Sequence, residues 1–269
     1  MSNLAQRVWS SVILATIFLA ATIAGGAPFV VLVTIMASIF WAEWTDMKMP
    51  GRDDRLQMTG ILALIAIALV VLVLPPEAVA PGLVAVLAGF SAVTVLLRDP
   101  RGIGGFVYAA LLLAALALLR GEWGDRAGLV AILFLVAIVW ATDIGAYFVG
   151  RSVGGPKLAP RVSPKKTISG AIGGLGAAVA AGVLVHLAFG VRSAGTAALL
   201  AILLSVLAQA GDLFESWIKR RAGVKDSSNV IPGHGGMMDR VDGLVFAAIG
   251  LWVAGAASAG IATPSRAFF

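Results

Sequence analysis

The chain contains no cysteine and few charged residues. Of its 269 residues only 13% are charged, whereas 59% are hydrophobic. Without cysteine it can form neither disulfides nor thiolate metal sites, so a metal ion would need oxygen ligands or one of the two histidines. Soluble domains carry about 25% charged residues, and the shortage here excludes that class. The mean hydropathy of +0.97 indicates an integral membrane protein.

The few charges are unbalanced, with a formal net charge of +6. A basic chain is typical of nucleic-acid binders, but in so apolar a protein anionic headgroups and phosphorylated substrates are better matched partners. The first apolar run follows Arg7 and resembles a secretory signal. Because many more apolar runs follow it, we interpret it as the first membrane anchor.

Apolar runs divide the whole chain. A helix needs about 20 apolar residues to cross a bilayer, and about nine segments approach this length. The expected spans are Trp9–Gly25, Pro28–Trp44, Met58–Leu74, Val79–Leu97, Gly105–Leu119, Gly128–Val149, Gly170–Phe189, Ala194–Phe214 and Val241–Ile261. Some are short, so the pattern is also compatible with eight or ten. We predict an all-α polytopic membrane protein with a single domain, 1–269, in which 1–120 supplies N-terminal helices and 121–269 carries the site.

The positions of lysine and arginine predict the orientation. With nine spans, sixteen of the 20 basic residues fall on the side of the N-terminus. Cytoplasmic loops carry the excess of Lys and Arg, so we expect a cytoplasmic N-terminus and a C-terminus on the opposite side.

Four aspartates lie at or near helix ends on the predicted cytoplasmic side. Asp143 and Asp212 lie inside the sixth and eighth spans, while Asp239 and Asp242 begin the ninth. A carboxylate in the membrane costs on the order of 2.5–3.5 kcal/mol, so several at matched depth predict a shared cation such as Mg²⁺. The alternative is that Asp143 and Asp212 each pair with a nearby Lys or Arg. Glu215 with Lys219 is open to the same interpretation, as an interfacial ion pair.

Two glycine-rich basic loops accompany these acids. In the first, Pro156, Pro160 and Pro164 forbid a regular helix, and Lys165 and Lys166 precede a helix N-terminus that suits phosphate. The alternative role of this loop is nonspecific headgroup binding.

The second loop turns sharply through Pro232–Gly236, with His234 between glycines that let the backbone approach a ligand. Near the first loop, Gly170 and Gly174 predict close packing of the seventh span on a neighbour.

Together these segments resemble the signature of the phosphatidate cytidylyltransferases, the CDP-diacylglycerol synthases. The matching residues are Ser216-x-Ile218-Lys219-Arg220, Lys225-Asp226, Ile231-Pro232-x-His234-Gly235-Gly236, Asp239-Arg240-x-Asp242, Asp143-x-x-Ala146-Tyr147-Phe148-x-Gly150-Arg151 and Ser163-Pro164-Lys165-Lys166-Thr167. Ser169 departs from the pattern, because relatives often carry Glu or Gln there. The second half of the chain matches closely, and the first half only as a series of spans.

The resemblance implies a bacterial-type inner-membrane enzyme, often a homodimer, with its active site facing the cytoplasm. It would make CDP-diacylglycerol and pyrophosphate from CTP and phosphatidate, within membrane lipids and without nucleic acid. It implies Mg²⁺, together with a monovalent cation such as K⁺. The implied residues are Asp212 and Asp239 for metal, Asp143, Lys165, Lys166 and Asp242 for catalysis, and Ser163, Lys219, Arg220, Lys225, His234 and Arg240 for substrate binding.

Other functions fit parts of the sequence. An isoprenoid-lipid cytidylyltransferase or a polyprenol kinase would use a similar site on another lipid. A CDP-alcohol transferase would need a repeated-aspartate motif, which the sequence lacks. A transporter also buries carboxylates for a coupling cation, but no internal repeat is visible. A noncatalytic scaffold would not need the aspartates for function.

Overall fold

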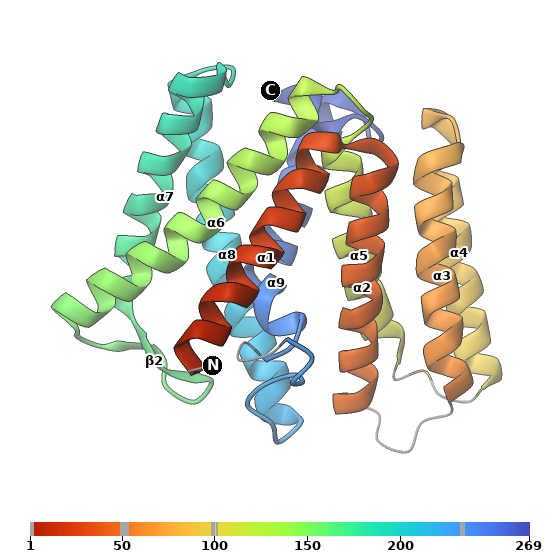
Figure 1. Cartoon of the computed structure of the whole chain (residues 1–269), viewed down its shortest axis with the longest axis horizontal. Coiled ribbons are helices and arrows are strands. Elements are labelled where there is room, and N and C mark those ends of the chain that lie inside the picture. The colour runs from red at the N-terminus through yellow and green to blue at the C-terminus, as the bar shows by residue number, and fades with distance from the viewer. Residues whose placement is uncertain (1–2, 49–53, 98–99, 101, 232–234) are drawn as a thin grey trace.

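The computed structural model describes residues 3–48, 54–97, 100, 102–231 and 235–269. It is nearly all helical (Figure 1). The elements are α1 (Asn3–Ala24), α2 (Gly26–Lys48), α3 (Asp54–Val73), α4 (Pro76–Leu96), α5 (Gly102–Arg120), α6 (Arg126–Val153), β1 (Lys157–Ala159), β2 (Ser163–Thr167), α7 (Ile168–Phe189), α8 (Ala194–Arg221), α9 (Met238–Ala259) and the 3₁₀ helix η1 (Pro264–Ala267).

Eight of the described helices, α2 to α9, are long and apolar enough to cross a membrane. The predicted all-α integral membrane fold is therefore confirmed. The first expected span corresponds to α1, whose apolar part covers only Val8–Ala24 and falls short of the other eight. Each remaining expected span lies on one helix, although α6 and α8 extend four and seven residues beyond their predicted ends, to Val153 and Arg221.

Helix α5 forms the centre of the bundle. Nearly all of its residues are buried, because α2, α3, α6 and α9 pack around it. Its small residues allow this contact: a Cβ on Gly105 would lie 2.2 Å from Nε1 of Trp44. Aromatic rings fill the next layer, with Phe90 of α4 stacked on Phe106 at 3.8 Å between ring centroids. Helices α3 and α4 lie on one side of this core and α7 on the other (Figure 1).

Helices α6 and α7 form the closest helix pair of the bundle, as the two glycines predicted. A Cβ on Gly170 would lie 2.8 Å from the carbonyl oxygen of Ala146, and one on Gly174 would lie 2.7 Å from that of Thr142. Only hydrogen fits at both positions, so the backbones touch directly. This contact fixes the depth of α6 and therefore the position of Asp143.

The proline-rich loop after α6 is an antiparallel hairpin. Lys157 pairs with Thr167 and Ala159 with Ser163, so β2 places Lys165 and Lys166 immediately before α7. The prolines do exclude a helix, but the sequence did not predict strands. The hairpin lies at the same end of the bundle as the C-terminal end of α8, and the C-terminus lies at the other end (Figure 1).

At that other end, the Arg120 side chain is buried where α5 finishes. Its guanidinium donates to the backbone carbonyls of Ile23 and Glu122 at 3.1 Å, and to those of Thr22 and Asp125. Carbonyls at helix ends lack partners within the helix, so a cation there supplies donors and complements the helix dipole. Arg120 therefore joins the end of α1 to the end of α5.

Candidate active site

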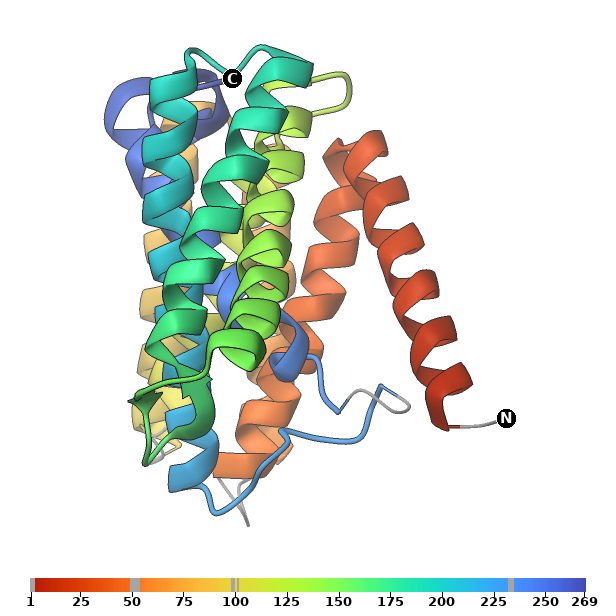
Figure 2. The same ribbon diagram turned by 90° about the vertical axis from the view of Figure 1, so that its left-hand side faces the viewer.

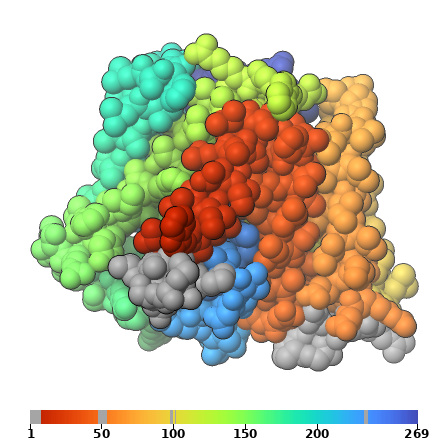
Figure 3. Space-filling model, viewed as in Figure 1, coloured from red at the N-terminus to blue at the C-terminus, as the bar shows by residue number. Residues whose placement is uncertain are grey.

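A cavity of about 730 Å³ opens between α1, α2, α6 and α9. Its wall is mostly apolar, with residues such as Phe18, Met36 and Trp140, and its charged residues gather at one end. These are Asp143, Asp212, Asp239, Arg240 and Asp242. Helix α1 covers the cavity from one side, lying across the face between α6 and α2 (Figure 3). Its N-terminal half stands apart from the other helices (Figure 2).

All four predicted aspartates thus reach one place, from three helices. Asp143 belongs to α6, Asp212 to α8, and Asp239 and Asp242 to α9. The carboxylates of Asp143, Asp212 and Asp242 lie close enough for their charges to interact. Each helix is held in place by glycine contacts, because a Cβ on Gly211 of α8 would lie 2.5 Å from the carbonyl oxygen of Asp242. Helices α8 and α9 can therefore bring their acids together.

Asp212 forms an ion pair with Lys166, which the β-hairpin places beside α8. Ser216, one helical turn after Asp212, donates to the same carboxylate at 3.4 Å. The two charged side chains remain 24% and 30% exposed, so a substrate phosphate can reach the pair. The ion-pair alternative from the sequence is therefore real for Asp212, and its partner lies in the loop expected to contact phosphate.

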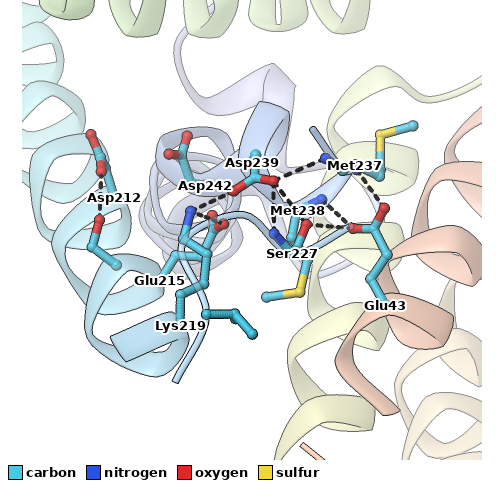
Figure 4. A network of polar contacts seen from close by, with 12 residues as sticks. Glu43, Asp212, Glu215, Lys219, Ser227, Met237, Met238, Asp239 and Asp242 are labelled. Atoms are coloured by element: carbon cyan, nitrogen blue, oxygen red, sulfur yellow. Dashed lines mark hydrogen bonds and ion pairs between the residues drawn. The ribbon is translucent and has the colours of Figure 1, made fainter. Parts of the chain in front are cut away.

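Asp239 is held by more contacts than any other of these acids (Figure 4). One oxygen accepts a bond from Lys219 at 2.5 Å. The other accepts from the backbone N–H of Ser227 at 3.0 Å and of Gly236 at 2.9 Å, and lies 3.0 Å from the Ser227 hydroxyl. Ser227 and Gly236, on either side of residues 232–234 in the sequence, therefore both contact the Asp239 carboxylate.

Lys219 also lies 3.0 Å from the Glu215 carboxylate, which is fully buried. Apart from this ion pair, neither oxygen of Glu215 has a hydrogen-bond partner among the residues that the structure describes. A buried carboxylate in this state depends on the charge of Lys219. The ion pair between Glu215 and Lys219 that the sequence allowed is therefore present, and Lys219 connects it to Asp239.

Glu43 of α2 is a residue of this site that the sequence did not predict. It is 3% exposed and accepts bonds from the hydroxyls of Ser227 and Ser228 and from the backbone N–H groups of Met237 and Met238 (Figure 4). The available signal was a carboxylate inside the second apolar run. Nothing local identified its partners, which are at least 184 residues further along the chain.

Comparison with known proteins agrees with these residues. The sequence profile described as the cytidylyltransferase family matches residues 5–257. The chain belongs to that family. It is therefore a nucleotidyltransferase, as its loop motifs predicted.

The relatives cover the chain almost completely. The chain is 42% identical to the phosphatidate cytidylyltransferase of Brucella suis biovar 1 (strain 1330), over 100% of its own length and 99% of the relative's. It is 36% identical to that of Pseudomonas aeruginosa, with 94% and 98% covered, and 34% identical to that of Bacillus subtilis (strain 168), with 91% and 95% covered. The resemblance thus extends to the first half, where the motifs gave no detail.

The other predicted residues occupy varied positions. Lys165, Arg220, Lys225 and Arg240 are exposed, and Arg240 also lines the cavity. Arg220 donates to the carbonyl of Val224 at 3.0 Å. Ser163 is half-buried at the start of β2. His234 lies outside the described residues, so its predicted contact with phosphate stays a prediction.

The donor set fits a divalent metal only in part. Among the described residues, no three acids or histidines stand close enough to form a complete metal site. Mg²⁺ is usually bound by one or two carboxylates plus waters and substrate phosphates, so a cluster of oxygen donors at a cavity open to phosphate suits it. Asp212 has fewer described hydrogen bonds than Asp239, so its oxygens are more available to a cation.

Proposed function

We propose that this chain is a phosphatidate cytidylyltransferase, converting CTP and phosphatidate to CDP-diacylglycerol and pyrophosphate. The observation that carries this proposal is the cavity, which is apolar along α1 and α2 and charged at the end formed by α6, α8 and α9. A lipid phosphate needs both environments at once. Membership of the cytidylyltransferase family, and relatives that bear this name, support the choice.

In the proposed reaction, a phosphate oxygen of the lipid attacks the α-phosphorus of CTP. The bond from that phosphorus to the bridging oxygen breaks, and pyrophosphate leaves with the electron pair. The nucleophile is already ionised at neutral pH, so no strong general base is required. Two anions must meet, and catalysis then depends on neutralising charge and fixing the line of attack.

The basic residues at the cavity supply this neutralisation. Lys166 forms an ion pair with Asp212, which lines the cavity, and Arg240 lines the same end. We assign both to substrate phosphates, with Lys165, Arg220, Lys225 and His234 as further phosphate contacts and Ser163 as a hydroxyl donor. Lys219 is already engaged by two carboxylates. It orients Asp239 and contributes positive charge to the site.

We also propose that Asp212 and Asp239 hold Mg²⁺, with Asp143 and Asp242 completing the acidic cluster and K⁺ assisting. When bound, the cation would offset the charge of the triphosphate. The role of the chain is to present oxygen donors from α8 and α9 at one depth, and to keep Lys166 beside them.

The same proposal includes the placement in the membrane. Counting α1 as a ninth span gives a cytoplasmic N-terminus and a C-terminus outside, in a bacterial inner membrane. CTP would then reach the charged end from the cytoplasm, and phosphatidate would enter sideways from the bilayer. The family resemblance further implies a homodimer, which light scattering of the purified protein would test.

The deciding assay incubates purified protein with radiolabelled CTP and one lipid at a time. We expect labelled CDP-diacylglycerol with phosphatidate and none with a polyprenyl phosphate or polyprenol. Turnover of an isoprenoid lipid alone would replace the proposed substrate. Solute flux into proteoliposomes without cytidylyl transfer would replace the enzyme by a transporter.

A further inference from the structure

Helix α9 begins without a cap of its own. The first N–H groups of a helix have no partner within it, and a nearby Ser, Thr, Asp or Asn side chain usually accepts from them. At α9 the residue in that position is Met237, whose side chain makes no capping bond. The acceptor is Glu43, which receives the N–H groups of Met237 at 2.7 Å and Met238 at 2.8 Å. Helix α2 therefore supplies the missing cap.

Four donors bond to the Glu43 carboxylate, two to each oxygen. One oxygen accepts from Met237 N–H and, at 2.7 Å, from the Ser228 hydroxyl. The other accepts from Met238 N–H and, at 3.0 Å, from the Ser227 hydroxyl. Each oxygen thus receives one backbone and one side-chain donor. A buried carboxylate is costly unless it is bonded in this way, so the contact is specific to a charged acceptor.

The loop approaches Glu43 as closely as its backbone allows. A Cβ on Gly236 would lie 2.6 Å from both Glu43 oxygens and 2.0 Å from the Ser227 hydroxyl. Only glycine fits there. Ser227, Ser228 and residues 236–238 are therefore packed tightly against the end of the Glu43 side chain.

Ser227 connects this contact to the active site. Its hydroxyl lies 3.0 Å from an oxygen of Glu43 and 3.0 Å from one of Asp239, and its backbone N–H donates to Asp239 at 3.0 Å. Ser228 contacts Glu43 but makes no described contact with Asp239. Substituting each serine in turn therefore distinguishes loss of a bond to Glu43 alone from loss of a bond to both Glu43 and Asp239.

We propose that Glu43 is a positioning residue for the reaction. It fastens Ser227, Ser228, Met237 and the first turn of α9 to α2, so that Asp239 keeps its orientation toward Lys219 and the cavity. The catalytic consequence rests on the proposed function, whereas the structural consequence does not.

The principal variant is Glu43→Gln. Whichever way the amide turns, one of the two oxygens becomes an NH₂ group, and one backbone N–H of α9 then faces a donor. We expect kcat at saturating CTP and phosphatidate to fall about 10- to 100-fold, as for other residues that orient a site from behind. Thr45→Val is the control, because Thr45 is buried in the same helix and its described hydrogen bonds go to Ala42 and Gln57, away from α9. It should lower stability without this loss of kcat.

The serines supply a second, milder test. Ser227→Ala should lower kcat more than Ser228→Ala, since only Ser227 reaches Asp239. If Glu43 acts through Ser227, the double variant Glu43→Gln/Ser227→Ala loses little more than Glu43→Gln alone. Additive losses in the double variant would contradict the proposal where Glu43→Gln folds, and equal effects of the two single serine variants would contradict it even if Glu43→Gln did not fold.

A spectroscopic readout is independent of activity. The chain has no cysteine, so Val230→Cys, at a position 59% exposed, places a single nitroxide label just after Ser228. We expect the label to gain mobility in Glu43→Gln and to keep its spectrum in Thr45→Val. An unchanged spectrum in Glu43→Gln would overturn the positioning role. Absence of phosphatidate turnover in the unsubstituted chain would overturn only the proposed function.

Discussion

At the scale of single residues, several charged side chains inside the bundle form ion pairs. Lys166 pairs with Asp212, and Lys219 bridges Glu215 and Asp239. A lone charge within a membrane is costly, and these contacts reduce that cost before any substrate binds. The pair of Asp212 and Lys166 differs from the second group in being partly exposed. It is therefore the pair that a bound phosphate can most easily rearrange.

We expect Asp212→Asn to lower cytidylyl transfer at least about 10- to 100-fold. The carboxamide keeps the shape of the side chain, but it cannot neutralise Lys166 or bind a cation as a carboxylate does. The measurement is turnover of CTP and phosphatidate across a Mg²⁺ titration, with the unfolding temperature as a check on folding. Glu122→Gln, an exposed acid on the loop before α6, is the control. Wild-type turnover in Asp212→Asn would remove this residue from the site.

Single residues also show where prediction from sequence stops. Asp143, Asp212, Asp239 and Asp242 were identifiable because a carboxylate in or beside an apolar run needs a reason to be there, and all four line one cavity. Glu43 satisfied the same criterion but had no motif around it. Its role depends on Ser227 and Ser228, whose proximity is a property of the folded bundle.

At the scale of elements, the helices followed from hydropathy, and the hairpin did not. A run of about 20 apolar residues has few structures open to it in a membrane, so α2 to α9 were predictable with errors mainly at their ends. Strands β1 and β2 are three and five residues long and rich in lysine and proline. Their pairing depends on turn geometry, and no alternation of apolar residues reveals it.

The contact between α6 and α7 is the element-scale feature most open to test. We expect Gly174→Ala to destabilise the protein by about 1–3 kcal/mol, because its Cβ would meet the backbone oxygen of Thr142 at 2.7 Å. Gly176→Ala on the same helix is the control, since nothing lies within 4 Å of a Cβ there. Thermal unfolding in detergent measures the difference. Equal midpoints for the two variants would show that the helices separate easily at Gly174.

At the scale of the whole molecule, the charged residues of the candidate site lie at one end of the bundle. The β-hairpin, residues 227–231 and the N-terminal end of α9 lie at that end (Figure 1). Elements from both halves of the sequence contribute, since Glu43 of α2 bonds to the loop before α9. Composition predicted a membrane protein of one domain. It could not predict that Glu43 of α2 contacts residues just before α9, because these residues are far apart in the sequence and no local pattern links them.

The proposed orientation predicts which single cysteines are accessible from outside the cell. Trp123→Cys, 77% exposed on the loop between α5 and α6, should react with a membrane-impermeant maleimide in intact cells. Val230→Cys should react only after the membrane is permeabilised. The reversed pattern would mean that the charged end of the cavity faces away from cytoplasmic CTP.

The buried position of the Arg120 side chain implies an order in which the helices reach their final positions. Its guanidinium satisfies carbonyls of residues 22 and 23, which leave the ribosome almost a hundred residues before it. Until α5 has been synthesised and inserted, the end of α1 has no donor for these oxygens. We therefore expect the first helix to reach its final position late, after the fifth, although it is synthesised before all the others.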